Sequence, residues 1–208
     1  MAKEFDIRRL ESAHLEQAFH LATEVFAKQS TIHRALGIDL EEYRAYLRPS
    51  FTAMVEKQLS IVASDQATGL VLGCLIWTDF YNATFANHSV PKTFSPLVAL
   101  TAALSAKYNR TFGPGEVALA DMAAVSAGAE GQGLYQAMRR AAEDQARRRG
   151  YRFVVSELSS AKTQHVLLRK MGHRAVAEIA FDQFEYKAMK PFKDIVDPPS
   201  LILSECTL

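Results

Sequence analysis

Residues 117–134 read VALADMAAVSAGAEGQGL. Residues 117–125 form an apolar run of strand length, interrupted by Asp121, and residues 126–133 are small and glycine-rich. From Leu134, apolar residues recur at helical spacing as far as Arg149. The stretch therefore predicts a buried strand, a glycine-rich turn and a helix whose first N–H groups and macrodipole suit a phosphate or pyrophosphate. Glycines at such a turn can also serve only to make it tight, and the pattern alone leaves both roles open.

The chain on either side of this stretch also alternates strands and helices. Strands or helices are predicted at residues 5–10, 15–26, 41–56, 59–63, 70–77, 94–110, 151–156, 161–170 and 176–186. Residues 28–37 predict a loop or a broken helix, and Pro49 predicts a kink or a division of its helix. This order indicates an α/β (α+β) fold with a mixed, partly parallel twisted sheet flanked by helices. We expect one domain over residues 1–208, with 190–208 as a C-terminal strand and tail.

The composition is typical of a soluble globular protein. The chain has 208 residues, 49% of them hydrophobic, and its 24 Lys and Arg nearly balance its 23 Asp and Glu. This apolar fraction is too high for a disordered chain, and the net charge of +1 disfavours nucleic-acid binding. The two cysteines do not indicate a disulfide scaffold, and no Cys/His cluster has zinc-site spacing. Without a leader-like segment or a membrane-length apolar run, we expect a cytoplasmic protein with no metal, nucleic-acid or membrane partner.

Two common phosphate-binding motifs do not fit the glycine-rich turn. A P-loop needs a lysine and then Ser or Thr after its second glycine, whereas Leu134 follows Gly133. A dinucleotide fingerprint needs a third Gly or Ala three residues after its second glycine, and Gln136 stands there.

Residues 125–134 resemble the acetyl-CoA loop of the GNAT superfamily of N-acetyltransferases, usually written Q/R-x-x-G-x-G/A after a strand ending in valine. Residues 166–173, VLLRKMGH, are similar to the helix end that this superfamily has as LYEKLGF. The motif-level resemblance covers residues 116–184, and the order of elements is similar over most of the chain. Within the superfamily, the layout is most similar to that of the arylalkylamine-type N-acetyltransferases.

The resemblance implies transfer of an acetyl group from acetyl-CoA to a primary amine of a small molecule, by direct attack in a ternary complex. Backbone N–H groups of Ala123, Ala124 and Val125 would polarise the thioester carbonyl. The pyrophosphate would rest on the turn and the start of the helix, at Ala129, Glu130, Gly131, Gln132, Gly133 and Leu134. A homodimer stays open as an assembly.

Several positions depart from the superfamily's pattern. Gly128 stands where Gln or Arg is usual, which removes one side-chain contact to phosphate. Glu130 stands where Arg is usual and puts an acid beside the expected pyrophosphate. Leu168 replaces the Tyr that often protonates the leaving thiolate. The insect arylalkylamine enzymes use a Glu in an Asp-Glu-Pro-Leu segment as base, and the nearest match here, residues 29–32, has no carboxylate.

The reaction calls for a general base, because an alkylamine is mostly protonated at neutral pH. Asp121 is the first candidate, since a carboxylate inside an apolar strand has a raised pKa unless it is paired. Glu157, at the end of the next strand, and His165, in the helix that follows, are the other catalytic candidates. Each also has a structural explanation: an ion pair for Asp121, a solvated strand end for Glu157 and surface exposure for His165.

Aromatic and polar residues in the first half of the chain are candidates for binding the acceptor amine. Aromatic residues at such spacings more often belong to a core, so this role and a packing role both stay open. The candidates are His33, Trp77 and Tyr81, with Tyr43, Phe80 and Phe85 as further aromatic residues of the same region.

The absent Tyr and Glu also favour an alternative, a GNAT-like module that binds acyl-CoA as a sensor or partner domain with weak or no catalysis. A nucleic-acid interface on the arginines of helix 134–149 is disfavoured, because Glu143 and Asp144 interrupt that face.

Overall fold

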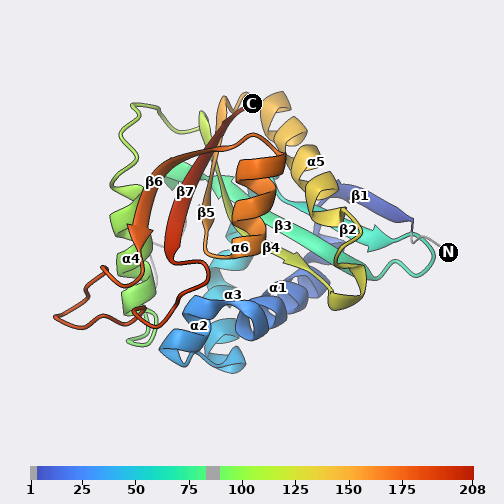
Figure 1. Cartoon of the computed structure of the whole chain (residues 1–208). Helices are drawn as coiled ribbons and strands as arrows, with labels where there is room; N and C mark the ends of the chain where they lie inside the picture. The colour runs from blue at the N-terminus through green and yellow to red at the C-terminus, as the bar shows by residue number, and fades with distance from the viewer. Residues whose placement is uncertain (1–3, 83–89) are drawn as a thin grey trace.

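The computed structural model describes residues 4–82 and 90–208. These residues contain a seven-stranded sheet in the order β1-β2-β3-β4-β5-β7-β6 (Figure 1). The strands are β1 (Phe5–Arg9), β2 (Ile61–Asp65), β3 (Val71–Asp79), β4 (Val117–Val125), β5 (Phe153–Leu158), β6 (Arg174–Ala180) and β7 (Ser200–Thr207). The α-helices are α1 (Leu15–Gln29), α2 (Thr31–Leu36), α3 (Leu40–Glu56), α4 (Ser95–Ser105), α5 (Leu134–Arg148) and α6 (Ala161–Gln164).

The sheet is mixed. β4 and β5 pair in parallel, whereas the pairs on either side of them are antiparallel. β7, from the C-terminal segment, is inserted between β5 and β6 and therefore lies inside the sheet. The predicted mixed, partly parallel sheet flanked by helices is confirmed. Residues 117–134 supply β4, the middle strand of the sheet, and the first residue of α5.

Helices cover both faces of the sheet. α5 packs against β1 to β4, α1 and α3 pack against β3, and α4 packs against β6 and β7. Figure 1 shows α5 (amber) crossing in front of β2 and β3, with α4 (green) beside β6 and β7. Side chains of consecutive residues of β4 pack on opposite faces of the sheet. Ala118 packs with Met138 of α5, and Leu119 packs in a cluster with Leu100 of α4. This alternation decides which side chains of β4 and β5 meet on each face.

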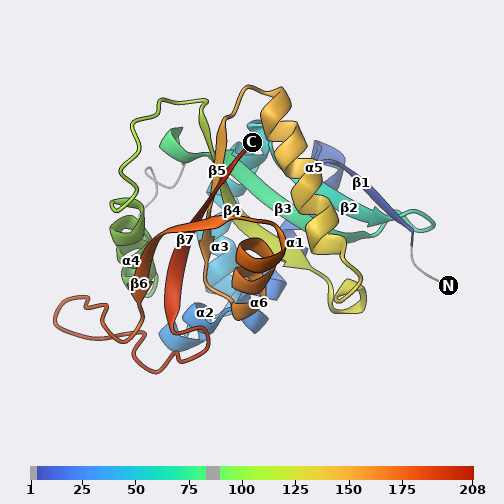
Figure 2. The ribbon, with the colours of Figure 1, turned by 45° about the horizontal axis from the view of Figure 1, so that its top comes forward.

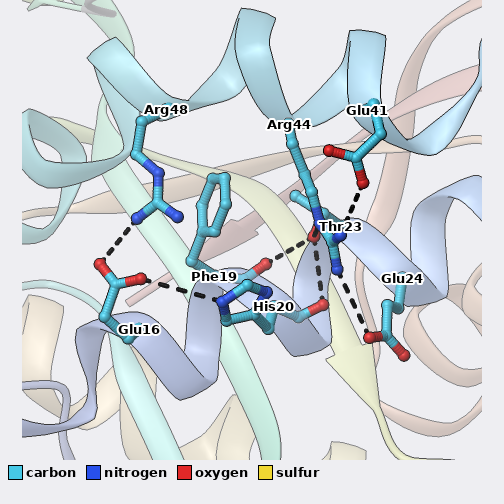
Figure 3. Close-up of polar contacts among 8 residues, drawn as sticks. All are labelled: Glu16, Phe19, His20, Thr23, Glu24, Glu41, Arg44 and Arg48. Atoms are coloured by element: carbon cyan, nitrogen blue, oxygen red, sulfur yellow. Dashed lines mark hydrogen bonds and ion pairs between the residues drawn. The ribbon is translucent and has the colours of Figure 1, made fainter.

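Polar and ring contacts fix α3 across α1 (Figure 3). Arg48 Nη1 lies 2.7 Å from Glu16 Oε1, and the Arg48 guanidinium lies 3.6 Å from the centre of the Phe19 ring. Further along α3, Arg44 Nε donates to Thr23 Oγ1 over 3.4 Å. Arg44 also forms ion pairs with carboxylates of both helices, as Figure 3 shows. These contacts hold α3 in place and with it the residues that α3 buries.

Two helical segments decide between alternatives that the sequence left open. Residues 28–37 were predicted as a loop or a broken helix, and the broken helix is confirmed: α1 ends at Gln29, and α2 begins at Thr31 because Ser30 Oγ accepts the N–H of His33. At Pro49, of the predicted kink or division, the division into two helices is absent, since α3 runs through Pro49 as one helix. Leu47 and Phe51, on either side of Pro49, are both buried in the core, and this packing keeps the two halves together.

The segment after β5 also differs in detail. The helix predicted at 161–170 is present, but its second half, His165–Lys170, is a π-helix. The strand predicted at 176–186 ends at Ala180. It ends there because Phe181 turns into the core, where its ring centre lies 6.0 Å from that of Phe192.

Glu205 of β7 is a buried carboxylate, 1% exposed, that joins three segments. Its oxygens accept from Tyr108 Oη and Arg110 Nη2 over 2.7 Å each and from Arg174 Nη2 over 2.8 Å. Burial and the hydrogen bond to Glu205 raise the pKa of Tyr108. The contacts tie the segment after α4 and the start of β6 to the centre of the sheet.

Candidate active site

β4 and β5 separate within the sheet. Their parallel pairing ends at Ala120 and Ser156. Beyond that point β4 stays paired with β3 as far as Val125, whereas β5 stays paired with β7 as far as Leu158. Figure 2 shows the two strands diverging. The β5-facing backbone groups of residues 121–125 have therefore lost their strand partner, and a cavity of about 1380 Å³ lined by both strands opens there.

Asp121 occupies a β-bulge at this separation. The residues just before and just after it pair with consecutive residues of β3, so Asp121 is an extra residue in the ladder. A bulge shifts the alternation of side chains by one residue and re-aims them locally. Leu119 and Met122 are accordingly both buried in the layer of α3 and α4, and Asp121 between them lines the cavity.

Glu157 is the neighbour of Asp121 on β5. Each follows the last pair of the parallel ladder, Ala120 and Ser156, so the two carboxylates are adjacent in register. Burial raises the pKa of Asp121 to about 7, and the nearby charge of Glu157 adds to the effect. Burial also raises the pKa of Glu157 to about 7, although Ser105 Oγ donates to its Oε1 over 3.4 Å and lowers it somewhat. We call Asp121 and Glu157 the carboxylate pair; near neutral pH such a pair readily takes up or releases a proton.

The glycine-rich turn lines another part of the same cavity. Gly131 and Gly133 have φ angles of +74° and +77°, which few other residues adopt, and a Cβ at either would meet no atom within 4 Å. Ala137 N–H donates to the carbonyl of Gly133. The N–H groups of residues 133–136, at the start of α5, therefore have no partner within the helix. Open space and a set of backbone donors at a helix N-terminus fit the phosphates of a CoA thioester.

Glu130 has two partners of its own in this turn. Its Oε2 lies 3.1 Å from Lys162 Nζ, and its Oε1 accepts from Gln29 Nε2 over 3.1 Å. These hydrogen bonds, that from Lys162 above all, lower the pKa of Glu130. The charge that we expected to oppose a pyrophosphate is thus compensated by Lys162, in the first turn of α6. Glu130 also links the turn to the ends of α1 and α6.

Aromatic side chains form the cavity wall on the side of α3. The rings of Tyr46 and Phe94 stack with centres 4.5 Å apart, and those of His33 and Tyr43 meet edge to face at 4.6 Å. Burial raises the pKa of Tyr43 and of Tyr46, and the charge of Asp121 adds to both shifts. Both phenols are therefore neutral. Aromatic walls beside carboxylates suit an organic cation with an apolar body.

Most residues singled out from the sequence line this one cavity. They are His33, Tyr81, Asp121, Ala123, Val125, Ala129, Glu130, Gly131, Gly133, Leu134 and Glu157. Ala124 and Gln132 are not part of its wall. His165 is exposed at the start of the π-helix, away from the cavity. Phe85 lies outside the described residues.

Trp77 does not line the cavity. It pairs with Ala120 on β3, and alternation turns its side chain toward α5, where it is completely buried. The guanidinium of Arg139 lies 4.6 Å from the centre of its ring. Trp77 therefore belongs to the core beneath α5 and does not line the cavity.

Sequence reasoning missed the partners of the site residues. Lys162 and Gln29 hold Glu130, and Ser105 contacts Glu157, across more than 30 residues of chain in each case. Nothing in the local pattern marks these three, because each is a polar residue at the end of a helix. Tyr46 and Phe94 fall within predicted segments 41–56 and 94–110 but were not singled out, and they contribute to both the core and the cavity.

No model of a known protein family matches the sequence, and no curated protein does. Solved structures match over the whole chain. The C-terminal condensation domain of Ebony, in complex with beta-alanyl-dopamine, is 16% identical with a TM-score of 0.87, and 100% of each chain is covered. Arylalkylamine N-acetyltransferase 2 from Aedes aegypti is 15% identical with a TM-score of 0.79, and 98% of this chain and 99% of that chain are covered. An agmatine N-acetyltransferase is 12% identical with a TM-score of 0.75, over 99% of this chain and 100% of its own.

The chain has the GNAT fold. The similarity to arylalkylamine N-acetyltransferases, predicted from the layout of the elements, is confirmed at the level of the fold. Of the two sequence motifs, residues 125–134 form the turn between β4 and α5, and residues 166–173 begin in the π-helix after α6. The described residues hold no group of three or more His, Cys, Asp or Glu side chains that could bind a metal ion. None of the helices in the described part of the chain has both the length and the apolar character needed to cross a membrane.

The carboxylate pair predicts an unusual dependence of stability on pH. Its pKa values of about 7 in the folded protein exceed the ordinary values of about 4, so between these limits the folded state holds protons that the unfolded chain releases. The free energy of unfolding, measured in urea, should therefore fall as the pH rises from about 4 to about 7. Asp121→Asn should flatten this fall, and Asp144→Asn, at an exposed carboxylate, should leave it unchanged. An identical fall in wild type and Asp121→Asn would mean that Asp121 ionises as freely as a surface group.

Proposed function

We propose that the chain is an N-acyltransferase that moves an acetyl group from acetyl-CoA to the primary amine of a small aromatic molecule. One observation carries the proposal: a single cavity joins the backbone donors at the start of α5 to the carboxylate pair at the separation of β4 and β5. The backbone donors suit the phosphates of a thioester donor, and the carboxylate pair suits an amine. The aromatic wall supplies the surface for the body of the acceptor.

Acetyl-CoA supplies the activated acyl group, and the chain supplies its placement. The N–H groups of residues 133–136 face the phosphates, while Lys162 balances Glu130 beside them. The backbone groups of residues 121–125 that β5 leaves unpaired line the opening between the strands. Their N–H groups stabilise the negative charge that develops on the acyl carbonyl oxygen during attack.

The carboxylate pair moves the protons. Its ionised member accepts a proton from the incoming ammonium and frees the nitrogen lone pair. The N–C bond then forms as the C–S bond breaks. The nitrogen gives up its second proton to the pair, and the pair passes a proton to the departing thiolate, where Leu168 provides no acid. The first proton accepted is released to solvent, so the pair returns to its starting state.

Turnover by carboxylate variants tests this assignment. With acetyl-CoA and tyramine, measured as release of free thiol, Asp121→Asn and Glu157→Gln should each lower kcat/KM by about 100-fold or more. For the wild type, kcat/KM should rise with pH through about 7, because the pair must be ionised to act. His165→Asn is the matched control, since His165 lies outside the cavity, and it should retain activity. Full activity in both carboxylate variants would remove the pair from the mechanism and favour the non-catalytic, acyl-CoA-binding alternative.

Binding of the donor is tested separately through the glycine turn. Gly131→Ala puts a side chain into the space beside the α5 donors and should weaken acetyl-CoA binding at least about tenfold by calorimetry. Gly69→Ala is the control, because Gly69 has a similar φ of +70° and an equally open Cβ position, in the β2–β3 turn. Both variants place alanine at a positive φ and so carry similar backbone strain, but only Gly131 lines the cavity. Equal acetyl-CoA affinity in both would show that the turn is only structural.

A second donor class is favoured by the presence of two carboxylates. An acceptor with one ammonium group pairs with one of them, and an aminoacyl group brings a second ammonium for the other. The condensation domain of Ebony, which is similar over the full length, is described with beta-alanyl-dopamine. A β-alanyl thioester is therefore the second candidate donor for this chain.

Two CoA thioesters of nearly equal shape separate the donors. β-Alanyl-CoA and butyryl-CoA differ by an ammonium in place of a methyl group. If the second carboxylate binds the donor, β-alanyl-CoA should be used at least about tenfold better, and Glu157→Gln should reduce that preference. A preference for butyryl-CoA, or for acetyl-CoA over both, would restrict the donor to simple acyl groups.

A further inference from the structure

Two residues of α2 that line the cavity each have a buried polar side-chain atom with no hydrogen-bond partner within the described residues. The atoms are His33 Nε2 and Thr31 Oγ1. His33 is only 4% exposed. Buried polar atoms are nearly always hydrogen-bonded in folded proteins, because leaving one unsatisfied costs its full desolvation. Two such atoms on one turn of one helix, both in residues of the cavity wall, point to a ligand group that completes them.

The hydrogen bonds of Ser30 define the role of His33. Ser30 Oγ accepts the backbone N–H of His33 over 3.2 Å and lies 2.8 Å from His33 Nδ1. Ser30 can satisfy both contacts when its hydroxyl oxygen accepts from the backbone and its hydroxyl proton is donated to Nδ1. Nδ1 then carries no proton, which assigns the ring proton of His33 to Nε2. Burial lowers the pKa of His33 to about 4, so the ring is neutral at physiological pH. His33 thus offers the cavity one N–H donor without a charge.

The surroundings of His33 describe the body of the ligand. Its ring meets Phe26, Tyr43 and Phe94 edge to face, with centres 5.9, 4.6 and 6.4 Å away. Tyr43 and Asp121 line the same cavity as His33, and Tyr43 is close enough to Asp121 for the carboxylate to raise its pKa, so Tyr43 neighbours both His33 and the carboxylate pair. An aromatic ring placed along Tyr43 would have its amine toward Asp121 and its far end toward α2.

We propose that His33 Nε2–H donates a hydrogen bond to a hydroxyl on the aromatic ring of the acceptor, at the end remote from the amine, with Thr31 Oγ1 as the second polar contact. His33 is then a specificity-determining residue that selects hydroxylated aromatic amines over their unsubstituted analogues. The inference rests on the proposed function for the position of the amine. A site built to hydrogen-bond a hydroxyl rejects the analogue without it, because its own buried groups then stay unpaired.

Tyramine and phenethylamine provide the test, because they differ only in the ring hydroxyl. With acetyl-CoA, the wild type should show a kcat/KM at least about tenfold higher for tyramine. His33→Phe keeps a ring of similar shape and removes the donor, so it should lose activity on tyramine about tenfold and keep or gain activity on phenethylamine. His33→Gln restores an N–H donor near the position of Nε2 and should recover part of the preference.

Thr78→Val is the matched control for removing a buried unpartnered polar group. The hydroxyl of Thr78 is buried and unpartnered among the described residues, as that of Thr31 is, but Thr78 does not line the cavity. This variant should leave the tyramine preference unchanged. Equal use of both amines by the wild type, or a proportional loss on both in His33→Phe, would overturn the role of His33.

Calorimetric binding of the two amines separates this inference from the proposed function. If tyramine binds more tightly than phenethylamine and His33→Phe abolishes the difference while no thiol is released, the acyl transfer is wrong and the recognition by His33 stands. If thiol is released but neither turnover nor binding distinguishes the amines, the acyl transfer stands and the recognition of the hydroxyl by His33 is wrong. Failure of both amines to bind would overturn the inference about His33 directly.

Discussion

The separation of β4 from β5 is the constraint on which the rest of the site depends. Their ladder stops at Ala120 and Ser156, and each strand continues with a different partner. On the α5 side, Arg139 lies at the end of the ladder, where its Nη2 donates to Ser156 Oγ over 2.7 Å. On the other side, the next residue of each strand is an acid. The same break therefore produces an opening between strands, unpaired backbone donors and a pair of adjacent carboxylates.

This arrangement lowers the stability of the folded protein. Two carboxylates at the centre of a sheet are desolvated, and their raised pKa values express that cost. An ordinary core would place apolar residues at both positions. Glu205, still more deeply buried on the neighbouring strand β7, shows the contrast: Arg110 and Arg174 pair with it, so it serves the fold. The carboxylate pair has no such cation beside it among the contacts of the described residues, which is the condition for binding a cationic amine.

The sequence predicted the architecture well because its strongest signals are local. The apolar run of β4, the glycines before α5 and the helical spacing after Leu134 each act within a few residues, and together they fixed the central unit. Asp121 and Glu157 were found for the same reason, as acids in or beside apolar strands. Their adjacency was not predictable, because it depends on the bulge and on strand register. The choice between a pocket role and a packing role for Trp77 stayed open for the same reason, because it depends on which face of the sheet the residue occupies. The pairing of Glu130 with Lys162 joins segments that no local pattern relates.

The carboxylate pair is the centre of this account, and direct titration tests it best. Carbon-13 NMR of the side-chain carboxyl groups, assigned with Asp121→Asn and Glu157→Gln, follows each acid through pH with and without tyramine. The account predicts that Asp121 and Glu157 titrate near pH 7, each affected by the other, and that tyramine shifts them to lower pH by pairing its ammonium with the ionised form. Independent titration of both near pH 4, unchanged by the amine, would contradict it.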